Sequence, residues 1–114
     1  MEVNLRGSNL IGVNLSHSIL AGANLSHANL SNANLRKANL HSADLSRCTL
    51  ESANLSHARL KNTNLFSADF SHANLAYADL TGGKDINILY VDDALLWNTI
   101  LPDGSLEVGA RYTR

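Results

Sequence analysis

Leucine recurs at every fifth position along most of the chain. Between residues 5 and 80 it occupies fifteen of sixteen such positions, and Phe70 takes the remaining one. The residue two places before each of these positions is small, and alanine fills ten of the sixteen. The residue directly before is asparagine or aspartate in thirteen cases, the exceptions being Ile19, Thr49 and Arg59. The repeating unit is therefore Ala-(Asn/Asp)-Leu followed by two variable residues.

This period fits neither regular helix nor flat strand. Successive leucines would step by about 140° around an α-helix. In a strand, an odd period would send every second leucine to the opposite face. The backbone must therefore bend once per repeat, so that each leucine and the small residue two before it both point inward. The asparagine or aspartate between them then points outward near the bend, where such side chains hydrogen-bond nearby backbone and tolerate unusual φ/ψ angles. We therefore predict a solenoid filled with leucine and alanine.

The repeat is similar to that of the pentapeptide-repeat proteins. The stretch AGANLSHANLSNANLRKANLHSADL at 21–45 carries the resemblance, which extends without a break over residues 3–80. It implies an all-β fold, a right-handed quadrilateral β-helix with four repeats, or twenty residues, in each coil. Sixteen repeats then make four regular coils, and residues twenty apart stack at about 4.8 Å. The stretch LWNTILPDGS at 96–105 is also similar to the TxxPDG ending of cyanobacterial members.

The regular pattern stops at TGGKD, directly after Leu80, and resumes one residue late. The apolar positions of the later register are Ile86, Val91, Leu96, Leu101 and Leu106. We expect residues 1–80 to form the β-helix, 81–106 a degenerate fifth coil or capping segment, and 107–114 a flexible tail. The sequence INILYVDDALLW also permits a short amphipathic helix over 86–97, and both alternatives stay open. Either would cover the apolar end of the fourth coil, with Tyr90 and Trp97 in the lid.

No cap is visible before the first repeat. A partner chain is one way to cover that end, and a dimer through the uncapped end is one form of it. The first residues, MEVNLRGSNL, lack the basic start and apolar stretch of a signal peptide, which predicts a cytoplasmic protein. No apolar run approaches the roughly 20 residues of a membrane-spanning helix, so we expect no membrane association.

The chemistry-bearing residues indicate neither catalysis nor metal binding. Four Ser-His pairs occupy outward slots without a cavity or an orienting aspartate, which argues against a nucleophile and base; they are Ser16-His17, Ser26-His27, Ser56-His57 and Ser71-His72. His17 and His57 fall two coils apart, too far to share a metal. The single cysteine, Cys48, falls in a small inward slot, which favours a core filler. We therefore predict no enzymatic activity and no cofactor.

Basic and aromatic residues gather on two sides of the predicted rod. Because residues twenty apart stack, the bend after Leu35 and Leu55 and the bend after Leu45 and Leu65 each carry such a column. The candidate partner surface consists of Arg36, Lys37, His57, Phe66 and Tyr77. The alternative is an exterior that serves solubility alone.

The net charge separates two candidate functions. Nine basic and ten acidic residues give a net charge of −1, so direct binding of nucleic acid is not expected. The resemblance implies, as an alternative, the activity of quinolone-resistance relatives, which mimic duplex DNA and bind DNA gyrase. Residues 1–80 hold five acids and six bases, whereas duplex DNA carries one negative charge per about 1.7 Å. We therefore favour a non-enzymatic protein-binding or scaffold module with an unidentified protein partner.

Overall fold

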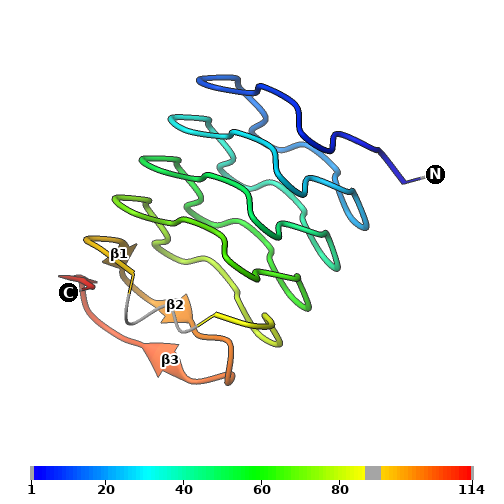
Figure 1. The fold of residues 1–114 in the computed structure, drawn as a ribbon. Coiled ribbons are helices and arrows are strands. Elements are labelled where there is room, and N and C mark those ends of the chain that lie inside the picture. The colour runs from blue at the N-terminus through cyan, green and yellow to red at the C-terminus, as the bar shows by residue number, and fades with distance from the viewer. Residues whose placement is uncertain (1, 87–90, 114) are drawn as a thin grey trace.

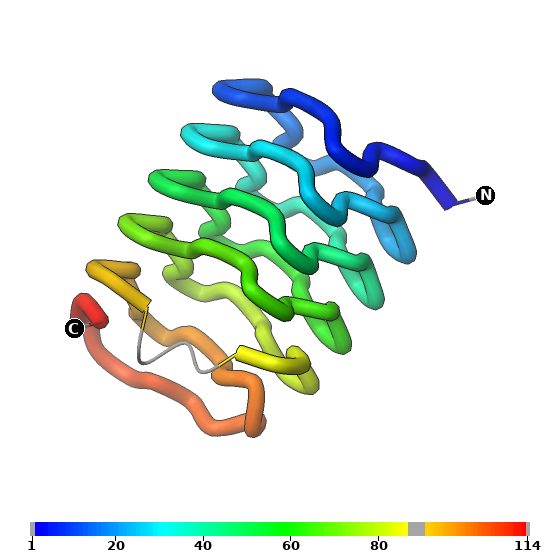
Figure 2. Tube along the Cα trace, in the orientation of Figure 1, coloured from blue at the N-terminus to red at the C-terminus, as the bar shows by residue number. Residues whose placement is uncertain are grey.

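The computed structural model describes residues 2–86 and 91–113 and forms a rod of stacked, nearly square coils (Figure 1). Its dimensions are 35 × 24 × 23 Å. The trace in Figure 2 shows the chain turning around one axis from the N-terminus toward the C-terminus, each coil lying against the one before it. The fold is the right-handed quadrilateral β-helix that the resemblance implied.

Neighbouring coils are joined by parallel bridges between residues twenty apart. Asn34 bridges Asn54, and Asn54 in turn bridges Asn74. Within this ladder the Leu35 N–H donates to the carbonyl of Asn54 at 2.7 Å, and the Asn74 N–H donates to the carbonyl of Ala53 at 2.9 Å. The same offsets recur on all four sides of the rod. Each coil therefore contains twenty residues, as predicted.

The core is a column of leucine and alanine side chains along the axis. Every leucine of the repeat from Leu25 to Leu65 is fully buried, and Phe70 fills the same position in the next repeat. The alanines two residues earlier are also buried, apart from the half-buried Ala68. Leu5, Leu10 and Leu15 are only partly buried, because the described chain places no coil before the first. The predicted inward orientation is confirmed.

The corners are β-turns built on the two variable residues of each repeat. At the corner after Leu55, the Ala58 N–H donates to the Leu55 carbonyl at 3.0 Å, and His57 has a φ of 60°. A positive φ at the third residue of the turn is the type II pattern. All sixteen corners share it, and glycine meets it at Gly7, Gly12, Gly22 and Gly82. The expectation that the asparagine and aspartate of the repeat take the unusual backbone angles is wrong, because those residues lie in the bridged sides.

The hydrogen-bonding role predicted for asparagine and aspartate is confirmed. In all thirteen repeats that have one, its Oδ1 accepts the backbone N–H two residues later, at the start of the corner. Asn54 is typical: its Oδ1 accepts both the N–H and the hydroxyl of Ser56, at 3.0 and 2.7 Å. This contact satisfies a donor that the ladder leaves free, which explains the serines that often follow the leucine.

Restoring this contact at one of the exceptions should stabilise the protein. Thr49 stands where the coils on either side have Asn29 and Asp69, and both of those accept the N–H two residues later. We expect Thr49→Asn to raise the free energy of unfolding by about 0.5–1.5 kcal/mol through a new bond from the Glu51 N–H. Urea denaturation measures the change. The opposite change in the next repeat, Asn54→Thr, should lower the free energy of unfolding by a similar amount. If both variants are as stable as the wild type, this contact does not stabilise the corner.

The fifth coil follows the register that resumes one residue late. Lys84 still bridges Asn64 at the usual spacing, but the next described bridges join Asn74 to Leu95 and Asp79 to Ile100, one residue further on. Strands β1 (Leu95–Leu96) and β2 (Thr99–Ile100) form two sides of this coil. The alternative of a helix over 86–97 is wrong for residues 91–97, which form a bend, a turn and β1. Its residues 87–90 lie outside the described part.

The last residues cover the open end of the rod. Strand β3 (Leu106–Glu107) pairs antiparallel with β2, and β4 (Arg111–Tyr112) pairs antiparallel with β1, so this segment crosses below the fifth coil (Figure 1). Thr113 is buried; its hydroxyl accepts the Ala94 N–H at 2.8 Å, and its own N–H donates to the Ala94 carbonyl at 2.8 Å. The expectation of a flexible tail over 107–114 is therefore wrong for 107–113, because unpaired groups of the fifth coil need partners.

The residues that cover the end of the rod are not those that were predicted to form the lid. Trp97 is 44% exposed and stands at a corner instead of covering the end, and Tyr90 lies outside the described residues. Leu106 is exposed on β3 and does not continue the inward column. Across the ranges that the structure describes, no helix has the length and hydrophobicity to cross a membrane.

Candidate functional site

Three aromatic side chains stack along one corner of the rod. His57, Tyr77 and Trp97 come from consecutive coils and are here called the aromatic corner. The rings of His57 and Tyr77 are parallel with centroids 4.7 Å apart, and those of Tyr77 and Trp97 are 5.5 Å apart at 50°. Tyr77 is 43% exposed and Trp97 is 44% exposed. The corner therefore presents a continuous aromatic edge to solvent.

The ladder holds these side chains in place. The Tyr77 N–H donates to the Trp97 carbonyl at 2.7 Å, and the His57 N–H donates to the Ala76 carbonyl at 2.9 Å. His57 and Tyr77 both have φ values near 60°, set by the same turn. Because the backbone is fixed and the rings stack on one another, little conformational freedom is left to lose when a partner binds.

Trp97 is the member that sequence reasoning missed. The extra residue between Lys84 and Leu95 shifts the register, so Trp97 takes the first corner position, equivalent to Ala76, while its ring reaches Tyr77. The signal was present, since the late register places Trp97 directly after the inward Leu96. To predict the contact of Trp97 with Tyr77, this late register has to be combined with the turn geometry of the corners.

The structure brings together four of the five predicted surface residues. Arg36 and Lys37 form the corner one coil before His57, and Tyr77 follows one coil after it, so these four share an edge. Phe66 belongs to the corner half a coil away, diagonally across the rod. There the guanidinium carbon of Arg47 lies 5.2 Å from the centre of the Phe66 ring, a cation–π contact. Phe66 is thus not part of the same surface.

The serines of the four Ser-His pairs have a structural role. In the four pairs each serine hydroxyl donates to the asparagine or aspartate two residues before it, at 2.6–2.7 Å. A nucleophilic serine needs its hydroxyl directed to the base instead. His57 is occupied by its stack with Tyr77, and His72 lies 3.9 Å from Asp93 on the exposed surface. Within the described ranges, no three histidine, cysteine, aspartate or glutamate side chains gather around a common point.

Cys48 is buried in the core, in the small inward slot that alanine takes in most repeats. Burial, reinforced by the nearby charge of Asp44, raises the pKa of its thiol to about 12. The thiol therefore stays protonated over the neutral and mildly alkaline range.

This environment predicts that Cys48 is unreactive in the folded protein. We expect no labelling by a thiol-specific disulfide reagent at about pH 8, where an exposed cysteine is substantially ionised. Stoichiometric labelling should appear in denaturant, because unfolding restores solvation of the thiolate. The absorbance of the chromophore released from the reagent measures labelling in the native protein and in denaturant. Rapid labelling of the native protein would contradict the inward position of Cys48.

Solved structures show what the chain is similar to. A pentapeptide repeat protein of the thylakoid lumen of Arabidopsis thaliana superposes with a TM-score of 0.82 at 25% identity, over 90% of this chain and 71% of that one. HetL, a pentapeptide repeat protein involved in heterocyst differentiation regulation from the cyanobacterium Nostoc sp. strain PCC 7120, gives a TM-score of 0.66 at 35% identity. That match covers 91% of this chain and 43% of HetL, so the chain spans less than half the length of that relative.

A more distant structure shares the fold alone. The plasmid-mediated fluoroquinolone resistance protein QnrB1 gives a TM-score of 0.60 at 19% identity, over 87% of this chain and 49% of that one. No curated protein sequence gives a significant match. The sequence model of the family described as pentapeptide repeats matches with eight copies over residues 1–36, 20–51 and 50–83. Together those ranges span residues 1–83, which include the whole leucine-repeat region, and the chain therefore belongs to the pentapeptide repeat family.

Proposed function

We propose that the chain is a non-enzymatic protein-binding or scaffold module that uses the aromatic corner and the adjacent Arg36 and Lys37 as its contact surface. The stack of His57, Tyr77 and Trp97 is the observation that carries the proposal. Tyrosine, tryptophan and arginine are the side chains that most often dominate protein interfaces. Here they stand on a rigid edge whose backbone every coil fixes by hydrogen bonds.

Two further observations support a binding role over a catalytic one. The serine hydroxyls of the Ser-His pairs donate to the asparagine or aspartate side chain two residues earlier, not to the neighbouring histidine. The relative HetL is involved in the regulation of heterocyst differentiation, and a protein that acts by binding suits such a role. Binding to a protein partner in the cytoplasm is part of this proposal.

The experiment is affinity capture from the host with four immobilised forms of the chain. We expect a partner that binds the wild type to be depleted at least about tenfold by Tyr77→Ser, the scale expected when one interface anchor is truncated. The charge reversal Arg36→Glu with Lys37→Glu should deplete it as well. Serine occupies the same corner position at residues 42, 52 and 67 with positive φ, so Tyr77→Ser keeps the fold.

Phe66→Ser is the matched control, since it removes an equally exposed aromatic from the opposite corner. Equal loss in Tyr77→Ser and Phe66→Ser would overturn the assignment of the surface. Inhibition of gyrase supercoiling by micromolar protein would favour the DNA-mimic alternative instead. The near balance of acids and bases in residues 1–80 makes us expect no inhibition.

A further inference from the structure

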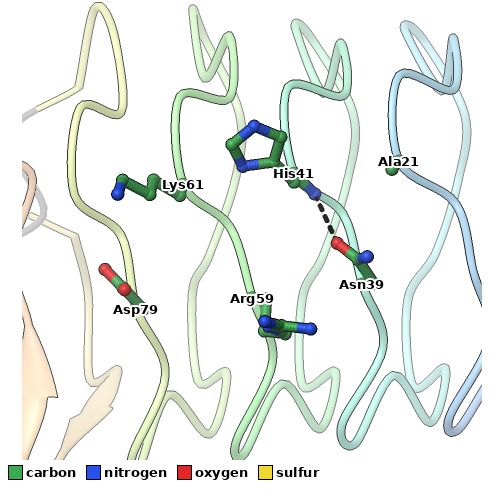
Figure 3. Close-up of a pocket in the computed structure, with 6 residues that line it drawn as sticks. All are labelled: Ala21, Asn39, His41, Arg59, Lys61 and Asp79. Carbon is green, nitrogen blue, oxygen red and sulfur yellow. Dashed lines mark hydrogen bonds between the residues drawn. The ribbon is translucent and has the colours of Figure 1, made fainter.

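A shallow pocket lies one side away from the aromatic corner. It has a volume of about 330 Å³ and is lined by Ala21, Asn39, His41, Arg59, Lys61 and Asp79 (Figure 3). These residues flank the buried leucines Leu20, Leu40 and Leu60 on the outer side, and they come from four successive coils. The pocket is therefore a product of stacking that no single repeat contains.

The sequence makes this pocket by departing from the repeat. Arg59 stands where thirteen other repeats have asparagine or aspartate, whose side chains turn back to the corner. The arginine side chain has no acceptor for the N–H of Lys61, and Arg59 is exposed. Ala21 has a short side chain and leaves space at the N-terminal edge of the pocket. In the next two coils, His41 and Lys61 occupy the same column with longer side chains (Figure 3).

The lining carries cations that the protein does not neutralise. Among the described residues, no carboxylate oxygen lies within 4.0 Å of a side-chain nitrogen of Arg59 or Lys61. The one acid of the pocket, Asp79, uses its Oδ1 to accept the N–H and hydroxyl of Thr81 at 2.9 and 2.6 Å. Asn39 uses its Oδ1 to accept the His41 N–H at 3.1 Å, which leaves its NH₂ group as a donor. The side chains that line the pocket thus include guanidinium, ammonium and amide donors, and in Figure 3 the Lys61 ammonium extends toward the coil of Asp79, away from the Arg59 guanidinium.

We propose that this pocket binds the phosphoryl group of a small phosphorylated molecule. The planar guanidinium of Arg59 donates two parallel hydrogen bonds, and the Lys61 ammonium supplies a further one when its flexible side chain turns toward the anion. A phosphoryl group presents three oxygens to such a set, whereas a carboxylate presents only two. The inference goes beyond the proposed function, since the pocket lies on another side of the rod and takes a small anion.

The test is a titration of the ¹⁵N-labelled protein with inorganic phosphate, followed by NMR of the backbone amides. Acetate and chloride are titrated separately at matched ionic strength. We expect saturable shifts of the His41 and Lys61 amides with phosphate alone, and at least a tenfold higher dissociation constant in Arg59→Asn. Asparagine is the common residue of that slot, so this variant keeps the fold. Lys61→Ser is a second variant with the same expected direction.

The control is Arg36→Ser, which removes one positive charge from the neighbouring corner and installs the serine found at residues 16 and 56 of the same column. It should leave the dissociation constant for phosphate within about twofold, since charges on different sides are screened by salt. Equal shifts with acetate or chloride would overturn the proposal. So would an equal loss of affinity in Arg36→Ser and Arg59→Asn, because net charge alone would then explain the binding.

Discussion

Replacing Leu45 with aspartate is expected to prevent folding. Leu45 is fully buried in a middle coil, between the leucine columns of the coils before and after it. Removing a buried leucine side chain costs about 2–5 kcal/mol, and an unpaired carboxyl in an apolar site adds several more. Together these approach or exceed the roughly 5–15 kcal/mol by which domains are stable. Circular dichroism and urea denaturation should show no cooperative unfolding transition.

Position decides the size of this effect. Leu5 belongs to the same column of stacked leucines but is only partly buried in the first coil. We therefore expect Leu5→Asp to fold with reduced stability, since its carboxylate reaches water. A Leu45→Asp protein that melts at the wild-type temperature would show that this leucine does not face the axis.

Deletion of residues 105–114 has the second largest expected effect. It removes β3 and β4, and with them the antiparallel partners of β2 and β1. The buried Ala94 would lose both of its hydrogen bonds to Thr113, and each unpaired buried group costs about 1–3 kcal/mol. We expect the free energy of unfolding to fall by at least about 2 kcal/mol. Urea denaturation measures this, and size-exclusion chromatography should show self-association through the uncovered strand edges.

The point variant Thr113→Val separates the cap from the length of the chain. It keeps the shape of the side chain but removes the hydroxyl that accepts the Ala94 N–H. We expect a loss of about 1–3 kcal/mol for the unsatisfied donor, with no self-association. If the deleted protein stays monomeric and as stable as the wild type, residues 105–113 do not act as a cap.

The regular part of the fold was predictable because every repeat has the same local structure, which its own five residues determine. Leucine at a period of five forces a bend, and the residue before it must then face outward, where it bonds the corner. The position of positive φ could also have been found, since Gly7, Gly12, Gly22 and Gly82 all occupy the second variable slot. Glycine there signals the left-handed backbone directly.

The cap and the full aromatic corner depend on contacts that no repeat encodes. Strands β3 and β4 are two residues each, and their antiparallel pairing with β2 and β1 is set by the edges that the fifth coil leaves open. Trp97 reaches Tyr77 only because one residue is added before β1. The pocket likewise arises from exceptions: Arg59 in place of asparagine, with Ala21 two coils earlier in the neighbouring column.

The relation between the two surfaces follows from the geometry of the rod. The residues of the aromatic corner and the donors of the pocket occupy neighbouring parts of the rod, and the same ladder of hydrogen bonds holds both in place. Stability in such repeat folds is a sum of contacts between neighbouring coils. Substitutions confined to exposed corner positions should therefore alter either surface with little effect on folding.

The most direct measurement of the central claim is the spacing of contacts between backbone protons. Nuclear Overhauser effects in a ¹⁵N- and ¹³C-labelled sample should join residues twenty apart on every side of the regular coils, such as Asn34 with Asn54 and Asp44 with Asn64. The amides of the buried leucines should also exchange slowly with solvent, because they donate to the next coil. Contacts dominated by residues three and four apart, or rapid exchange at these leucines, would contradict the coiled winding.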